Sequence, residues 1–357
     1  MISLSLCMIV KNEEKTLSRC LDSVKNIVDE IIIVDTGSSD QSIEIAKHYG
    51  SKIYHFQWVD DFSAARNFAF SHAQKDYILT MDADDVFSEA DSKKLQELKQ
   101  TITPTIDAVT MKYLAGFDES GNVLVSLRQV RMVRRENQCK WQGAVHEYLE
   151  VQGNMLHSDI AVKHKRMHKN SDRNLRIYEQ RLHNGVHFSS RDLYYYANEL
   201  YDHQQYKRAI QFYQKFLQSD KCWIEDVIQT HGRIAECYAA LGKMDNAIHS
   251  ALNTLKFAPP RADSCCRLGF FFLQINRPEV AVHWFQFATQ LPAIDTGGIT
   301  NHACSTWIPH LELSVCYSHL GEYQKALEHI EIARTICPQH EIILKNKAIL
   351  ENFVKNN

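Results

Sequence analysis

Three carboxylates stand close together at Asp82, Asp84 and Asp85. They follow the apolar run 77–81, which has the composition expected of a buried strand. Carboxylates crowded at a strand end repel one another and lose solvation, and a divalent cation offsets that cost. Hard oxygen ligands favour Mg²⁺ or Mn²⁺, and two carboxylates leave coordination positions that a diphosphate can fill. The alternative interpretation is an aspartate-rich turn that caps a helix expected over 88–98.

Other polar residues follow a second predicted strand or occupy a helix of the same region. Asp35 ends the β-branched run 30–34, and its carboxylate can accept hydrogen bonds from a base or a ribose. Capping of the next helix is the alternative role for Asp35. Arg66 and Asn67 lie on a helix expected over 62–73, where each is either a surface group or part of the same crevice. Polar groups at several matching strand ends favour the crevice.

The elements that must position these residues alternate between strand and helix over the first 170 residues. The expected strands are 3–10, 30–34, 53–56 and 77–81, and the expected helices are 14–28, 38–49 and 62–73. This alternation predicts an α/β domain with a Rossmann-like, mainly parallel sheet covered by helices. Ligands of such sheets bind beyond the carboxyl ends of the strands, where the polar clusters fall.

A helical repeat replaces the strand pattern from about residue 189 onward. Small residues recur at equivalent places, and Ala247 and Ala281 are 34 positions apart, which is the tetratricopeptide period. The spacing from Ala209 to Ala247 is 38 and from Ala281 to Ala326 is 45, so insertions interrupt the array. Short side chains let paired helices pack closely, and stacked pairs leave a concave surface. An irregular helical domain is the alternative.

The chain is therefore expected to hold an α/β domain over 1–170, a connecting helix over 171–187 and an all-α tetratricopeptide-repeat domain over 188–357. A net charge of -3 provides no bulk attraction for nucleic acid. No run of about 18 apolar residues is present, so no membrane span is expected. Ten scattered cysteines without a C-x-x-C pair, and an N-terminus without signal-peptide features, predict a reducing cytoplasmic location.

The first domain resembles family 2 glycosyltransferases of the GT-A fold. The resemblance is carried, in order, by CMIVKNEEKTLSRCLDSV, EIIIVDTGSSDQS and DFSAARNFAFSHAQKDYILTMDADD. It implies a nucleotide-sugar donor and inversion of the anomeric carbon in one displacement. The implied binding residues are Val10, Asn12, Glu13 and Asp35 by the nucleoside, Arg66 and Asn67 near the base and ribose, Asp82 at the ribose, and Asp84 on a metal that bridges the diphosphate.

A second constellation follows in the later part of this domain. Arg131 belongs to an R-x-x-R run and either neutralises phosphate oxygens or lies on a solvated strand edge. His164 closes a short apolar stretch, and the GT-A resemblance implies that it is a late metal ligand. Glu147 is the first candidate for the base that takes the acceptor proton, His146 the second and Asp85 the third. The alternative for His146 and Glu147 is a strand-end pair that orients the loop.

The R-x-x-R run, the W-x-G-x-V-H-E segment and the late histidine, followed by helical repeats, narrow the resemblance. Together they are similar to the sublancin-type transferases that glycosylate cysteine or serine side chains of glycocin bacteriocins. This implies transfer from a UDP-sugar to a peptide or protein. Most aromatic residues of the repeats are expected in the core, because aromatic stripes at helical spacing usually pack. For the others, an acceptor-peptide groove and dimerisation through the same helices are the two alternatives. Two other functions stay open: transfer to a cell-envelope glycan, and an inactive tetratricopeptide adaptor.

Overall fold

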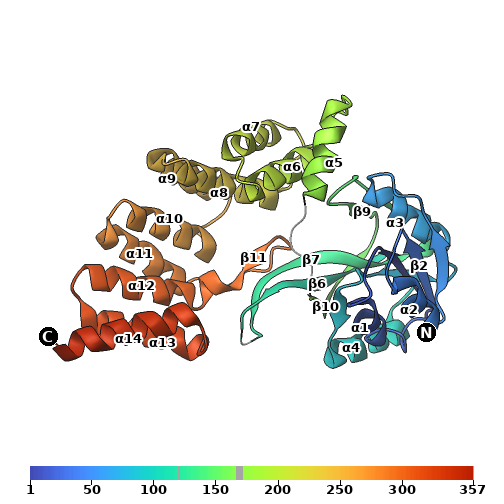
Figure 1. Cartoon of the computed structure of the whole chain (residues 1–357), viewed down its shortest axis with the longest axis horizontal. Coiled ribbons are helices and arrows are strands. Elements are labelled where there is room, and N and C mark those ends of the chain that lie inside the picture. Colours follow the sequence, from blue (N-terminus) through green and yellow to red (C-terminus); the bar gives the residue numbers. More distant parts are fainter. Residues whose placement is uncertain (120, 166–171, 357) are drawn as a thin grey trace. The chain divides into compact units, whose positions relative to one another are not determined.

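The computed structural model describes residues 1–119, 121–165 and 172–356. The chain divides into two compact units (Figure 1). One consists of Met1–Ala115 with Leu127–Gly185, and the other of Gly116–Ser126 with Val186–Asn357. Within these described ranges, no helix has both the length and the apolar character needed to cross a bilayer.

The first unit is built on a mixed sheet with the strand order β3-β2-β1-β4-β7-β6-β10-β5. Its strands are β1 (Leu4–Val10), β2 (Glu30–Asp35), β3 (Lys52–His55), β4 (Tyr77–Thr80), β5 (Asp85–Phe87), β6 (Ala108–Phe117), β7 (Val123–Arg134) and β10 (Met155–His164). The four strands β3, β2, β1 and β4 are parallel, whereas β7 runs antiparallel to β4 and β5 antiparallel to β10. A separate antiparallel pair is formed by β8 (Lys140–Gln142) and β9 (Tyr148–Glu150).

Helices cover both faces of this sheet, which explains why β1 and β2 are apolar almost throughout. The helices are α1 (Leu17–Asp22), α2 (Ser42–His48), α3 (Phe62–Ser71), α4 (Glu89–Thr101) and α5 (Arg173–His183), and a short 3₁₀ turn spans Arg135–Asn137. Alternate residues of β1 face two cores, so Leu6 and Met8 join α1, α2 and α4, whereas Cys7 joins α3. The carboxyl ends of the parallel strands stay free for a site.

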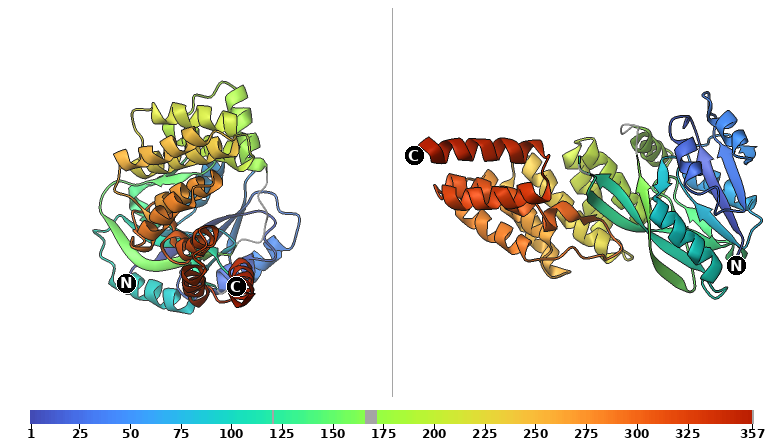
Figure 2. Two further views of the ribbon diagram at one scale, coloured as in Figure 1. Left: turned by 90° about the vertical axis from the view of Figure 1, so that its left-hand side faces the viewer. Right: turned by 90° about the horizontal axis from the view of Figure 1, so that it is seen from below.

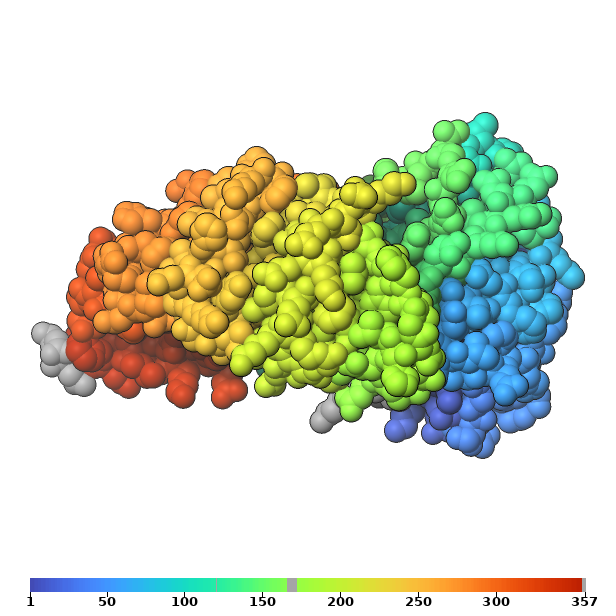
Figure 3. Space-filling model, turned by 90° about the horizontal axis from the view of Figure 1, so that it is seen from above, coloured from blue at the N-terminus to red at the C-terminus, as the bar shows by residue number. Residues whose placement is uncertain are grey.

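In its described residues, the second unit contains four antiparallel helix pairs and a final helix. The pairs are α6 (Ser190–Asp202) with α7 (Tyr206–Leu217), α8 (Ile224–Ala240) with α9 (Met244–Leu252), α10 (Ala262–Gln274) with α11 (Pro278–Thr289), and α12 (Ile308–His319) with α13 (Tyr323–Ile336). The pairs follow one another in chain order along this unit (Figure 3). The final helix α14 (Glu341–Asn356) lies beside α13 (Figure 2).

The predicted repeat is confirmed in its details. Ala209, Ala247, Ala281 and Ala326 are all fully buried, and each lies on the second helix of its pair. The 45-residue spacing holds an insertion between α11 and α12 with the short strand β11 (Thr300–Asn301), which pairs with Val125 and Ser126 of the same unit. Two 3₁₀ turns, Asn253–Lys256 and His302–Ser305, complete the unit.

The predicted α/β class of the first domain is also confirmed, with local differences. The helix expected over 14–28 is shorter, because only Leu17–Asp22 is α-helical and turns flank it. Asp85 was expected in a polar turn, but it begins strand β5. β5 is only three residues long and forms through pairing with β10, which is distant in the sequence. No local sequence pattern therefore predicts this strand.

The small residue Gly269 generates the first prediction. A Cβ at this position of α10 would lie 2.6–2.8 Å from ring carbons of Phe285, which is fully buried on α11. We expect Gly269→Ala to lower the free energy of unfolding by about 2 kcal/mol, because the packed ring has no room to move. Without that contact, alanine would stabilise the helix by about 1 kcal/mol.

Thermal and urea unfolding of the whole chain measure this effect. The control is Gly269→Ala combined with Phe285→Leu, which should be more stable than the sum of the two single changes predicts. An unchanged or raised melting temperature in Gly269→Ala would show that the helices can separate at no cost.

Candidate active site

A cavity opens at the carboxyl ends of β1, β2 and β4, where the sequence predicts ligand binding. Five of the predicted residues line it: Val10, Glu13, Arg66, Asp82 and Asp84. They come from the end of β1 and the loop after it, from α3, and from the turn after β4. The topology of the first unit therefore brings together residues that are more than 70 positions apart in the chain.

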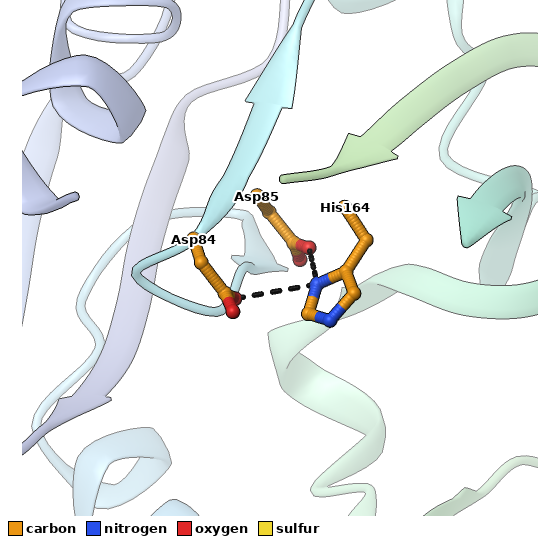
Figure 4. A group of neighbouring side chains, drawn as sticks. All are labelled: Asp84, Asp85 and His164. Atoms are coloured by element: carbon orange, nitrogen blue, oxygen red, sulfur yellow. Dashed lines mark hydrogen bonds and ion pairs between the residues drawn. The ribbon is translucent and has the colours of Figure 1, made fainter. Parts of the chain in front are cut away.

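Asp84, Asp85 and His164 form a compact cluster beside this cavity (Figure 4). The Nδ1 atom of His164 is 3.3 Å from an oxygen of Asp84 and 3.3 Å from an oxygen of Asp85. The antiparallel pairing of β5 with β10 places His164 opposite Asp85 and so creates the contact. Burial lowers the pKa of His164, but its hydrogen bonds to the two carboxylates outweigh burial and raise the pKa to about 9.

The cluster has the chemistry of a divalent cation site. One ligand atom from each of the three side chains lies within 4.8 Å of the others. Carboxylate ligands suit both Mg²⁺ and Mn²⁺, and an imidazole ligand favours Mn²⁺ over Mg²⁺. The residues present therefore fit a metal of the kind that the sequence predicts, with Asp85 as a third ligand candidate.

Arg131 lies behind the cluster and does not line the cavity. Its Nη1 atom is 3.0 Å from Asp85, its guanidinium stacks 4.7 Å above the ring of Tyr113, and only 4% of the residue is exposed. Asp85 is itself fully buried and accepts a hydrogen bond from the backbone of Asp82. Arg131 thus neutralises Asp85 in this structure. The sequence left a contact to phosphate and a solvated strand edge as alternatives, and the burial of Arg131 excludes the solvated edge.

Arg66 bridges two carboxylates from opposite sides of the site. Its Nη2 donates to Asp82 at 2.7 Å and its Nε donates to Glu147 at 2.6 Å, while its face lies 4.8 Å from the ring of Trp141. Burial tends to raise the pKa of Asp82, but the charges of Arg66 and Arg131 lower it to about 2. Asp82 is consequently a carboxylate at every physiological pH.

The loop that carries His146 and Glu147 has an unusual backbone. His146 adopts a left-handed conformation with φ 52°, and Gly143 has φ 95°. A non-glycine residue in this region is strained, and such strain persists only where the surroundings hold it. Here the carbonyl of Ala144 accepts from the backbone of α3, and the carbonyl of Val145 accepts from the hydroxyl of Tyr178 on α5.

Three residues that were predicted to contact the nucleoside form hydrogen bonds with the protein backbone instead. The Asn67 amide bonds to both backbone groups of Trp141, and the Asn12 side chain accepts from the backbone of Ser39. Asp35 accepts from the backbone of two following residues; burial raises its pKa, but hydrogen bonds, chiefly from Ser38, lower it overall. None of the three lines the cavity, so in this structure they shape the loops around it.

Sequence reasoning missed several residues that line the cavity. They are Ile9, Lys11, Thr36, Trp58, Phe62, Ala83 and Arg173. Ile9, Lys11, Thr36 and Ala83 adjoin predicted residues, and the aromatic pair lies in the segment before and at the start of α3, so their neighbourhood was a usable signal. Arg173 had no such signal, because it follows the last recognised motif.

Comparison with known proteins defines the class of the first unit. Residues 5–137 match the family model described as Glycosyl transferase family 2. The first unit therefore carries a family 2 glycosyltransferase domain, and its sheet confirms the predicted GT-A-like fold.

Curated relatives match only parts of the chain. A TPR repeat-containing protein of Synechococcus elongatus is 40% identical over 151 residues, which is 42% of this chain and 36% of that protein. The SPbeta prophage-derived glycosyltransferase SunS of Bacillus subtilis is 33% identical over 143 residues, which is 39% of this chain and 33% of that protein. The chain thus matches about a third of the length of these relatives.

Among solved structures, the TPR protein YrrB covers 50% of this chain and 84% of its own, with 17% identity and a TM-score of 0.37. The repeat architecture of the second unit rests on its own four helix pairs.

The double ion pair of Arg66 generates the second prediction. We expect Arg66→Leu to lower the free energy of unfolding by about 3 kcal/mol, because it leaves Asp82 and Glu147 without their shared cation. Adding Glu147→Gln should recover part of the loss, since one of the two unpaired charges then disappears. Urea denaturation in a chelating buffer measures both variants.

Lys25→Met, which breaks an exposed ion pair with Asp22, is the control and should leave the free energy of unfolding close to that of the wild type. A cost for Arg66→Leu as small as that of the control would mean that the bridge contributes nothing to folding.

Proposed function

We propose that the chain is an inverting, metal-dependent glycosyltransferase that moves a sugar from a UDP-sugar to a cysteine or serine side chain of a peptide or protein. The observation that carries the proposal is the cluster of Asp84, Asp85 and His164 beside a cavity in a family 2 domain. The glycosyltransferase name of the Bacillus relative supports the reaction class. The acceptor class comes from the resemblance of the motifs to peptide transferases.

The donor is assigned to the cavity beside the cluster. Asp84 and His164 would hold Mn²⁺ or Mg²⁺, with Asp85 as a further ligand, and a cation held there stabilises the charge on the departing diphosphate. Val10 and Glu13 line the cavity and are assigned to the nucleoside, and Asp82, held by Arg66, is assigned to accept a hydrogen bond from the ribose. The low pKa of Asp82 keeps it an acceptor.

The base is assigned to Glu147. Arg66 donates to one oxygen of its carboxylate, Oε1, and so fixes the group, while Oε2 would take the acceptor proton. A cysteine acceptor eases this step because a thiol has a pKa of about 8.5. His146, in its strained conformation, is the second candidate. Asp85 is fully buried and paired with Arg131, so the proposal keeps it in the cation cluster.

Acceptor binding is assigned to the helical unit. Stacked helix pairs leave an extended concave surface, which suits a peptide. The ten cysteines are free, and a reducing cytoplasm would keep them so.

Metal dependence is the third prediction. Calorimetry should show that the wild-type chain binds UDP at least about tenfold more tightly with Mn²⁺ than with a chelator. Asp84→Asn should abolish most of this difference, because it removes a charged ligand. Asp22→Asn, a change of the same kind on the exposed surface of α1, should keep it. Metal-dependent UDP binding that survives Asp84→Asn would exclude Asp84 as a ligand.

The role of Glu147 is the fourth prediction. Glu147→Gln should slow sugar transfer by roughly 10²–10⁴-fold while UDP affinity stays near the wild-type value. The rate is measured by mass spectrometry of cysteine- and serine-containing peptides after incubation with UDP-glucose, UDP-N-acetylglucosamine and UDP-galactose. His146→Gln is the comparison. A near-normal rate in Glu147→Gln with a severe loss in His146→Gln would transfer the base assignment to the histidine.

A further inference from the structure

A basic side chain from α5 reaches the donor cavity although its helix lies beyond the recognised motifs. Arg173 is the first residue of α5 and lines the cavity together with Phe62 and Trp58. Its guanidinium lies 4.5 Å from the centre of the Phe62 ring. Stacking on a ring uses the face of a guanidinium, whereas phosphate recognition uses its N–H edge, so one arginine can do both.

The charged side chains that line the cavity indicate a role for Arg173. Three cationic side chains line it, Lys11, Arg66 and Arg173, and three carboxylates line it, Glu13, Asp82 and Asp84. Arg66 is engaged by Asp82 and by Glu147, which itself lies outside the lining. Lys11 and Arg173 are the other two cations of the described lining. A diphosphate needs positive groups besides the metal.

The position of Arg173 is set by the rest of its helix. Arg176, one turn further on, pairs with Asp60 through two contacts of 3.2 and 2.8 Å. Asp60 also accepts a hydrogen bond from the indole of Trp58, a cavity residue. Tyr178 is fully buried and its hydroxyl donates to the carbonyl of Val145. The helix α5 is therefore held at two separate places, by Asp60 and by the carbonyl of Val145.

We propose that Arg173 binds the diphosphate of the nucleotide donor and that Arg176, through Asp60, is a positioning residue for it. This inference rests on the proposed function, because it assumes that the cavity takes a nucleoside diphosphate. It adds a donor ligand from a helix that sequence reasoning treated only as a connection. A guanidinium offers a bidentate fork to phosphate oxygens that lysine lacks.

The test compares ligands with and without phosphate. Binding of UDP, GDP, ADP and uridine is measured with Mn²⁺ for the wild-type chain, Arg173→Met, Arg173→Lys and Arg181→Met. Arg181 is an arginine of the same helix that does not line the cavity, so it is the matched control. We expect Arg173→Met to weaken nucleoside diphosphate binding about tenfold or more and to leave uridine binding unchanged. Arg173→Lys should fall between, and Arg181→Met should match the wild type.

A double-mutant cycle tests the positioning role of Arg176. Arg176→Met alone should weaken UDP binding a few-fold, and it should add nothing when Arg173 is already methionine. A purely structural role would instead lower the melting temperature and weaken UDP and uridine binding alike.

The outcomes separate this inference from the function on which it rests. If the wild-type chain binds none of the three diphosphates, both are overturned. If it binds one of them and Arg173→Met binds it equally well, the inference about Arg173 fails and the proposed function stands. Equal weakening of uridine and UDP in Arg173→Met would also overturn the inference, because the loss would not then concern phosphate.

Discussion

Charge balance at the carboxyl end of β4 is the constraint on which the rest of the first unit depends. Asp82, Asp84, Asp85 and Glu147 gather there, and Arg66 and Arg131 face them. An unpaired buried charge costs several kcal/mol, so the pairing of each arginine with its carboxylate stabilises the folded domain. A cation bound by His164 would displace the proton of the imidazole. Four carboxylates and two guanidinium groups then leave two negative charges, which one divalent cation neutralises.

The sheet topology delivers these charges from distant parts of the chain. Helix α3 places Arg66 beside Asp82. Strand β7, which is antiparallel to β4, places Arg131 beside Asp85. After β4 the chain turns back through Asp82–Asp84 into β5, which pairs with β10 so that His164 meets Asp85. A one-residue slip in that pairing would point the His164 side chain to the other face of the sheet. The register of a three-residue strand therefore decides whether the cluster exists.

The sequence predicted the elements and the location of the site better than the directions of its side chains. Apolar runs that end in Asp35 and Asp82 correctly mark strand ends, because a parallel sheet buried on both faces has a strong pattern. The pattern cannot say whether a polar residue there faces a ligand or the backbone of a neighbouring loop. Asn67 illustrates this limit, since its partner Trp141 is 74 positions away on a strand of three residues. The buried pairing of Arg131 with Asp85 is hidden for the same reason.

The helix α5 shows why the site depends on more than its motifs. A helix that only links two domains needs no buried face, yet Ile177 and Tyr178 are almost completely buried. The left-handed residues near the cavity include Asp60 with φ 56° and His146 with φ 52°. Arg176 pairs with the first, and Tyr178 lies against the loop of the second through Val145 and a ring contact of 6.5 Å. Strained backbone persists only where its surroundings over-determine it, so α5 belongs with the site that it braces.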